Sequence, residues 1–116
     1  MKSPTYPSWE ESHMYQLRNT VTVHYGKFRE YHAAMEQLNE IARQRGWVEA
    51  KRFVPVAGVD NQYICEWEYA SLADYERETE SFYTDTEAMK VFRDAAELVI
   101  EGTSMTELLD SAPTIA

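Results

Sequence analysis

A chain of 116 residues with 44% hydrophobic side chains is long enough for one compact domain with a small core. Its 20 acidic residues outnumber its 11 basic ones, which gives a formal charge of -9 at pH 7. Phosphate backbones and anionic membrane surfaces repel such a chain, so we exclude nucleic acid and membrane as partners. The sequence has no apolar run that spans a bilayer and no signal-like segment, and its one cysteine cannot form an internal disulfide. We therefore expect a cytoplasmic protein.

The beginning of the chain differs from the rest. Its first twelve residues, MKSPTYPSWEES, contain two prolines and three serines and show no apolar period. We interpret residues 1–12 as an N-terminal arm, followed by one domain over residues 13–110 and a tail over residues 111–116. Tyr6 and Trp9 favour docking of the arm on a neighbouring surface over a free tail.

The first half of the domain changes its hydrophobic period at a glycine. Apolar and polar residues alternate over residues 14–24, which predicts a strand. After Gly26 the apolar residues recur with helical spacing over residues 27–45. Gly46 follows Arg43 and Arg45, a combination that is typical of a helix C-terminus.

A hairpin follows the first helix. We predict strands over residues 47–56 and 62–69, and the short glycine-containing turn between them favours antiparallel pairing. Pro55 places the first of these strands at a sheet edge or marks its end.

The second helix of the domain is expected to be broken. It starts after Ser71, whose hydroxyl can cap the helix N-terminus. The sequence Thr84-Asp85-Thr86-Glu87 is a second capping pattern, so we predict a break there and a helix that continues to about Val99. A last strand is predicted over residues 103–109.

The order strand-helix-strand-strand-helix-strand predicts an α+β, ferredoxin-like domain. In this fold two helices cover one face of a four-stranded antiparallel sheet. The first and third strands are neighbours, so we expect Arg18 to face Glu66 or Glu68 across the sheet. The face without helices is mixed in polarity, and we expect it to pair with a second copy of the chain rather than to stay solvated.

Three stretches make the chain resemble the dimeric α/β-barrel superfamily over about residues 13–110. Residues 15–20 (YQLRNT), followed by residues 25–27 (YGK) and an amphipathic helix, resemble its first strand and helix. Residues 66–72 (EWEYASL), followed by Tyr75, resemble its third strand as it enters the second helix. We place the chain near the NIPSNAP-like and antibiotic-biosynthesis-monooxygenase-like groups. This resemblance implies a homodimer whose sheets close a barrel, but its members have many activities and some have none known.

Asn19 is the polar exception on the row of side chains that is expected to face the helices. A polar amide there needs a hydrogen-bond partner or a cavity. The resemblance implies that an Asn on the first strand and a Trp at the end of the third line a pocket between sheet and helices. Asn19 and Trp67 match these two positions, and a purely structural role is the alternative for both.

The leading hypothesis is a small-molecule-binding or cofactor-free enzyme pocket between sheet and helices for a small aromatic, apolar or enolisable ligand. Oxygenation or proton transfer is the chemistry expected if the pocket belongs to an enzyme. The candidate catalytic residues are Asn19, His32 and Trp67. Asn19 would hold an oxygen, Trp67 would stack on the ring, and His32 or a tyrosine would move the proton. The candidate substrate-binding residues are Tyr15, Tyr31, Tyr63 and Phe92.

We expect no cofactor and no metal. The haem-degrading relatives carry an axial histidine on the second helix, and residues 72–99 of this chain contain no histidine. The three histidines show no metal-ligand spacing, there is no glycine-rich phosphate loop, and we interpret Glu36 and Glu40 as a solvated helix face.

A non-catalytic dimeric module that supports a partner or binds a ligand without turnover is the alternative function. This alternative predicts that aromatic side chains fill the interior completely. The enzyme hypothesis predicts an open cavity with Asn19 in its wall.

Overall fold

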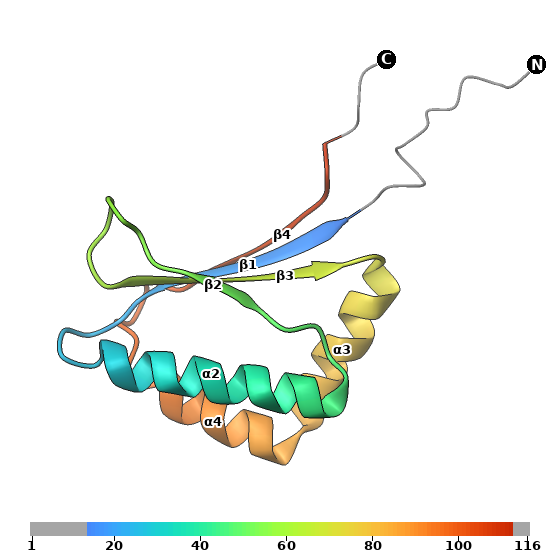
Figure 1. The fold of residues 1–116 in the computed structure, drawn as a ribbon, viewed down its shortest axis with the longest axis horizontal. Coiled ribbons are helices and arrows are strands. Elements are labelled where there is room, and N and C mark those ends of the chain that lie inside the picture. Colours follow the sequence, from blue (N-terminus) through green and yellow to red (C-terminus); the bar gives the residue numbers. More distant parts are fainter. Residues whose placement is uncertain (1–13, 113–116) are drawn as a thin grey trace, which may run out of the picture.

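The computed structural model describes residues 14–112 and has the predicted order of elements. The strands are β1 (Tyr15–Thr22), β2 (Lys51–Phe53), β3 (Gln62–Tyr69) and β4 (Met105–Leu109). The helices are α2 (Phe28–Arg45), α3 (Leu72–Thr84) and α4 (Thr86–Ala96). The strands form one antiparallel sheet in the order β2-β3-β1-β4, and the helices lie on one side of it (Figure 1). This arrangement confirms the α+β, ferredoxin-like class.

The end of α2 follows its sequence pattern. Gly46 adopts the left-handed conformation with φ 74°, and its amide donates back to the helix carbonyls of Ala42 and Arg43. A residue with a Cβ is strained at such a φ, which explains why glycine stands there.

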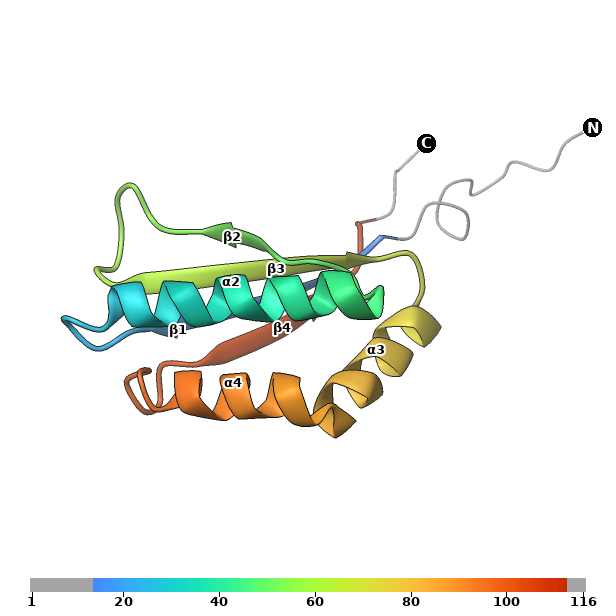
Figure 2. The same ribbon diagram turned by 60° about the horizontal axis from the view of Figure 1, so that its bottom comes forward.

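The predicted break in the second helical segment is also confirmed. Asp85 separates α3 from α4, and its carboxylate accepts a hydrogen bond of 2.9 Å from the amide of Ala88. Arg45 at the end of α2 donates to the same carboxylate at 2.8 Å. The salt bridge therefore joins the end of α2 to the junction of the other two helices, and Figure 2 shows how α3 and α4 diverge at that junction.

The core lies between the sheet and the helices. Val23 and Tyr63 have exposed fractions of 0% and 1%. Both belong to a buried cluster that α2, α4, β1 and β3 supply together. Its members are Val21, Val23, Tyr31, Met35, Tyr63, Cys65 and Ala95. No β4 residue belongs to this cluster, and no helix within residues 14–112 is long and apolar enough to cross a membrane.

Two element boundaries differ from the prediction. The strand predicted over residues 47–56 is wrong except at its centre, because the edge strand β2 has only three residues. Ala50 instead exchanges two hydrogen bonds with the Asn39 side chain of α2, at 2.8 and 2.9 Å. The helix ends at Ala96 rather than near Val99, and Val99 pairs with Val23 as an isolated β-bridge. The whole of the predicted N-terminal arm, and the predicted C-terminal tail after its first two residues, lie outside the described residues.

Candidate functional site

The register of the sheet places four of the predicted site residues in one band on the helix-facing side. In the β1–β3 pair, Asn19 lies opposite Cys65 and Tyr15 lies opposite Tyr69. Asn19 is therefore the diagonal neighbour of both Tyr63 and Trp67, a relation that corresponds to about 7–8 Å between backbones. Tyr15 is in turn the diagonal neighbour of Trp67.

Two more predicted residues, Tyr31 and His32, contact this band from α2. The Nδ1 atom of His32 lies 2.8 Å from the Tyr63 hydroxyl, and its Nε2 atom lies 2.8 Å from Oε1 of Glu36, one turn further along the helix. An ionised carboxylate can only accept, so neutral His32 carries its proton on Nε2. Nδ1 is then an acceptor, and the Tyr63 hydroxyl donates to it. The result is a continuous chain from a buried phenol to a solvent-exposed carboxylate.

Tyr31 packs against the same ring. The Tyr31 and Tyr63 rings meet edge to face with centroids 5.2 Å apart, and Phe28 lies 5.6 Å from Tyr63 on another side. Burial, with smaller effects from Cys65 and Tyr63, raises the pKa of Tyr31 far above its usual value. Burial likewise raises the pKa of the Cys65 thiol to about 12. Both groups are therefore neutral near pH 7, and Cys65 is no nucleophile there.

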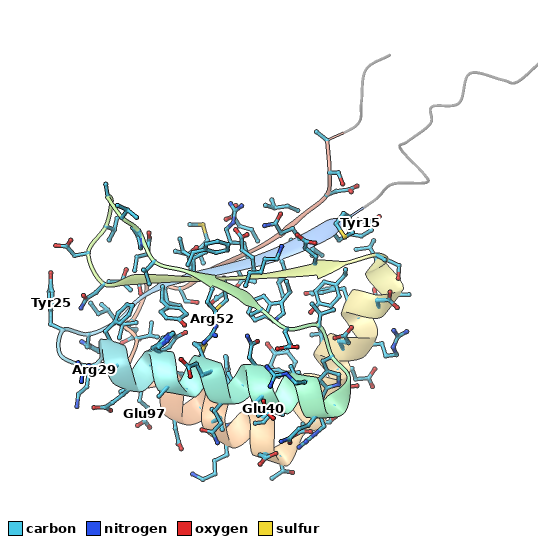
Figure 3. The ribbon with its side chains drawn as sticks, in the orientation of Figure 1. Tyr15, Tyr25, Arg29, Glu40, Arg52 and Glu97 are labelled. Atoms are coloured by element: carbon cyan, nitrogen blue, oxygen red, sulfur yellow. The ribbon has the colours of Figure 1, made fainter. Side chains whose placement is uncertain are left out.

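Arg52 is the cation of this region. It pairs with Cys65 in the β2–β3 register and therefore points to the helix side, where Figure 3 shows it between β2 and α2. Its Nη1 atom lies 4.0 Å from Oε1 of Glu36. Within residues 14–112, this nitrogen is the one buried side-chain polar atom without a hydrogen-bond partner. The Tyr63 pKa is raised, first by burial and then by Cys65, while the positive charge of Arg52 acts in the opposite direction.

Asn19 turns away from this chain of hydrogen bonds. Its amide nitrogen donates to the hydroxyl of Thr106 on β4 at 3.0 Å, with longer contacts to Ser104 and to the Met105 carbonyl. Thr106 is exposed, and Leu108, which follows it on the same face, is 40% exposed. The Asn19 amide therefore has hydrogen-bond partners within the sheet, next to a part of β4 that is poorly covered.

The remaining predicted residues are less closely joined. Phe92 on α4 meets Phe82 edge to face at 5.5 Å and is 39% exposed, so it belongs to an aromatic group at the α3–α4 junction. Trp67 lies opposite Leu17 and packs against the core cluster. Tyr15 lies near the start of β1, at the far end of the sheet from the turn that leads into α2 (Figure 3).

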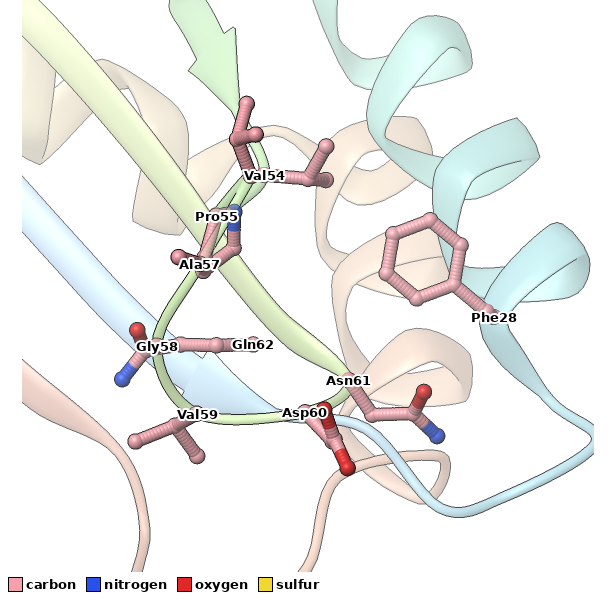
Figure 4. Close-up of a pocket in the computed structure, with 10 residues that line it drawn as sticks. Phe28, Val54, Pro55, Ala57, Gly58, Val59, Asp60, Asn61 and Gln62 are labelled. Atoms are coloured by element: carbon pink, nitrogen blue, oxygen red, sulfur yellow. The ribbon is translucent and has the colours of Figure 1, made fainter.

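A hollow of about 390 Å³ lies beside this site, between the first residue of α2 and the loop that joins β2 to β3. Figure 4 shows the Phe28 ring across from Val54 and Asn61. Of the described residues, Asp60 is the one charged residue that lines this hollow. The lining consists of Phe28 and residues 54–62. Phe28 therefore contacts both the hollow and the buried Tyr63 ring, whereas none of the predicted site residues lines the hollow.

The opposite face of the sheet carries an apolar row. The pairing registers place one residue from each strand side by side across it, and strand alternation points them away from the helices. The row consists of Phe53, Ile64, Thr20 and Met105. Phe53 is 47% exposed and Met105 is 55% exposed.

A charged row runs beside the apolar one. It alternates in sign from strand to strand: Lys51, Glu66, Arg18 and Glu107. The Arg18 guanidinium donates to the Glu66 carboxylate at 2.8 Å, which confirms one of the two pairings predicted for Arg18.

Two residues of the site, Glu36 and Arg52, were not expected from the sequence. Glu36 is 58% exposed at its side chain, as a solvated face requires, yet it bonds to His32. Their spacing of four residues along one helix is the signal that points to this contact. Arg52 had no such signal, because its orientation depends on the register of a three-residue strand. No three His, Cys, Asp or Glu side chains in the described part of the chain form a metal site.

No protein-family model matches this chain, and no curated protein matches it in sequence. Among solved structures it is similar to a NIPSNAP family protein from Agrobacterium tumefaciens, with a TM-score of 0.69, 22% identity, and coverage of 83% of this chain and 90% of that chain. A second NIPSNAP family protein of unknown function from that bacterium gives 0.71 at 19% identity, covering 86% and 89%.

The fold is also similar to that of SnoaB, a cofactor-independent oxygenase from Streptomyces nogalater. The TM-score is 0.65 at 19% identity, with 88% of this chain and 95% of that chain covered. At these identities the similarity establishes the fold alone. It confirms the resemblance to NIPSNAP-like and monooxygenase-like proteins at that level.

Proposed function

We propose that this chain is a small homodimeric enzyme that acts without a cofactor on an aromatic or enolisable ligand held between sheet and helices. One observation carries the proposal: a partly exposed histidine and a buried tyrosine are joined by a 2.8 Å hydrogen bond, with a carboxylate on the other side of the imidazole. Acid–base groups of this kind are what enolisation or cofactor-free oxygenation of a phenol requires. SnoaB shows that this fold supports an oxygenase without a cofactor.

Asn19 is the proposed oxygen-holding group. Its amide already donates to Thr106, whose position on the exposed helix-facing side of β4 lets a ligand replace that contact. Trp67 and Tyr15 continue the same band and supply aromatic surface for a ring. We assign His32 and Tyr63 to proton transfer, and Tyr31 and Phe92 to the apolar walls.

The homodimer is proposed from the open sheet face. The apolar row of Phe53, Ile64, Thr20 and Met105 can lie against the same row of a second copy across a twofold axis. The neighbouring charged row alternates in sign, so a twofold arrangement can set cations against carboxylates.

Oxygen uptake tests the activity. Purified protein in chelator-treated buffer, without flavin or haem, is given phenolic and β-dicarbonyl compounds in an oxygen electrode. We expect uptake with at least one compound and its loss in Asn19→Leu. Gln16→Leu on the other face of β1 is the matched control and should keep the activity. An absence of uptake with the whole set contradicts the oxygenase proposal.

Native mass spectrometry tests the dimer. The wild-type chain should appear at twice its monomer mass, and Met105→Glu should reduce the dimer because it places a carboxylate in the apolar row. Leu108→Glu is the matched control on the same strand but the opposite face, and should remain dimeric. A monomeric wild type contradicts the proposal.

The alternative, a non-catalytic dimeric module, is favoured by the filling of the interior. Tyr63 is 1% exposed, and Tyr31, Phe28 and His32 surround its ring. A stable dimer that takes up no oxygen, with or without bound mass, would support this alternative.

A further inference from the structure

We propose that Tyr63 and His32 form an acid–base relay, with Glu36 as its positioning residue. In this relay the Tyr63 oxygen takes a proton from an enolisable ligand. The choice of ligand class rests on the function proposed above, whereas the relay itself rests on the contacts among these side chains.

Glu36 fixes the direction of the relay. Its carboxylate accepts from Nε2 of His32 at 2.8 Å, which leaves Nδ1 without a proton and directed at the Tyr63 hydroxyl. Without this acceptor the imidazole is free to place its proton on either nitrogen, and in one of these tautomers it can no longer accept from Tyr63. A base oriented by a third group is the arrangement that activates hydroxyl side chains in enzymes.

The proton steps balance without another reactant. The Tyr63 hydroxyl passes its proton to Nδ1 of His32, which becomes an imidazolium that Glu36 stabilises. The resulting phenolate removes a proton from the carbon next to a ligand carbonyl, and the C–H electron pair forms the enolate. Tyr63 is then protonated again, and the imidazolium releases its extra proton to solvent, to which His32 is open at 46% of its side chain.

Arg52 stabilises both anions that these proton steps create, the Tyr63 phenolate and the ligand enolate. Its guanidinium is near enough to Tyr63 to oppose the rise in the hydroxyl pKa, and its Nη1 nitrogen lacks an acceptor. This nitrogen forms a 4.0 Å ion pair with Glu36 but has no hydrogen-bond acceptor, so an oxygen anion that forms beside it is stabilised by accepting from the free N–H. Arg52 therefore points to a ligand that ionises at oxygen, as an enol or a phenol does.

The hollow at the β2–β3 loop provides the approach. Phe28 forms part of its wall, and the Phe28 and Tyr63 ring centroids lie 5.6 Å apart, so one side chain borders both the hollow and the relay. A volume of about 390 Å³ accommodates a compound of one or two rings.

Nitrogen-15 NMR of the histidine side chains tests the positioning role. Wild-type His32 should be in the Nε2–H tautomer at pH 8, and Glu36→Gln should produce a mixture of tautomers because the amide can donate to Nε2 as well as accept from it. Glu40→Gln, one turn further along α2, is the matched control and should leave His32 unchanged. A wild-type Nδ1–H tautomer, or a tautomer that Glu36→Gln does not alter, overturns the proposal.

Deuterium exchange into 2-tetralone, an aromatic ketone with acidic C–H bonds, tests the relay as a base. We expect wild-type protein to accelerate exchange in D₂O, and Tyr63→Phe to lose about 10²- to 10⁴-fold of that acceleration. Glu36→Gln should lose less, and Glu40→Gln should lose none. Equal rates in wild type and Tyr63→Phe, or no acceleration at all, overturn the relay. Exchange without oxygen uptake would retain the relay and contradict the oxygenase, so the two failures are distinguishable.

Discussion

The helix-facing side of the sheet is well covered at β2 and β3 but poorly covered at β4. We call these two parts the closed side and the open side. On the closed side, Tyr63 and Cys65 are at most 2% exposed, and α2 packs over them. On the β4 side, Thr106 is exposed and Leu108 is 40% exposed, and neither belongs to the core cluster. On the closed side the Tyr63 hydroxyl bonds to His32 at 2.8 Å, while Asn19 on the other side bonds to Thr106 where water and ligands can compete. The same face of the sheet thus has a buried part at β3 and an accessible part at β4.

The largest difference between the two sides should appear in stability. Tyr63→Ala removes a buried ring that three aromatic neighbours contact, and should lower the free energy of unfolding by about 3–5 kcal/mol. Leu108→Ala should cost less than about 1 kcal/mol because its side chain is already partly in water. Chemical denaturation of both variants measures this. Similar losses would mean that the β4 side is as well packed as the β3 side.

The closed side should also make the protein sensitive to alkali. Burial raises the pKa of Cys65 from 9.0 to about 12, and burial raises that of Tyr69 to about 12. Above pH 9 the unfolded thiol loses its proton while the folded one keeps it. The folded state then binds more protons, so stability falls as pH rises, by up to about 1.4 kcal/mol per pH unit for each such group.

Cys65→Ala isolates the contribution of the thiol. Between pH 9 and pH 10, before the unfolded tyrosines ionise fully, the variant should lose stability less steeply than the wild type. Urea denaturation at closely spaced pH values measures both slopes. Parallel curves would show that the thiol titrates alike in the folded and unfolded chain.

A smaller effect is expected from the hydroxyl that joins β3 to α2. Tyr63→Phe keeps the ring but removes the donor to His32, and should cost about 0.5–1.5 kcal/mol. Tyr83→Phe, at a residue that is 59% exposed, is the control and should cost nothing measurable. A neutral Tyr63→Phe would mean that the 2.8 Å contact is not maintained in solution.

The sequence predicted those features that depend on local pattern. Gly46 after two arginines and the capping residue Asp85 mark helix ends by chemistry that acts within a few residues, so α2 and the α3–α4 break were found. The neighbouring positions of β1 and β3 followed from the order of elements, and Arg18 was expected to face Glu66 or Glu68, of which the structure has Glu66. The limits of β2 were missed because Ala50 bonds to Asn39, a contact between elements that no local pattern encodes.

The candidate site was predicted less completely than the fold. Tyr31, His32 and Tyr63 are aromatic or titratable residues on predicted apolar rows, and in the structure they lie together. Their partner Arg52 could not be found, because its approach to α2 depends on how an edge strand packs. The hollow at the β2–β3 loop depends in the same way on the path of an irregular segment.

The smallest expected change in stability is that of Asn19→Leu, and this variant tests whether the open side at β4 binds a ligand. Asn19→Leu removes donors to Thr106 and to neighbouring oxygens at 3.0–3.5 Å, but these acceptors lie in an exposed area where water can replace the amide. The free energy of unfolding should therefore change by less than about 1 kcal/mol. If oxygen uptake is lost while stability is retained, Asn19 acts on the ligand. A large loss of stability would instead show that its hydrogen bonds hold β4 to β1, and that the helix-facing side of β4 is part of the structural frame.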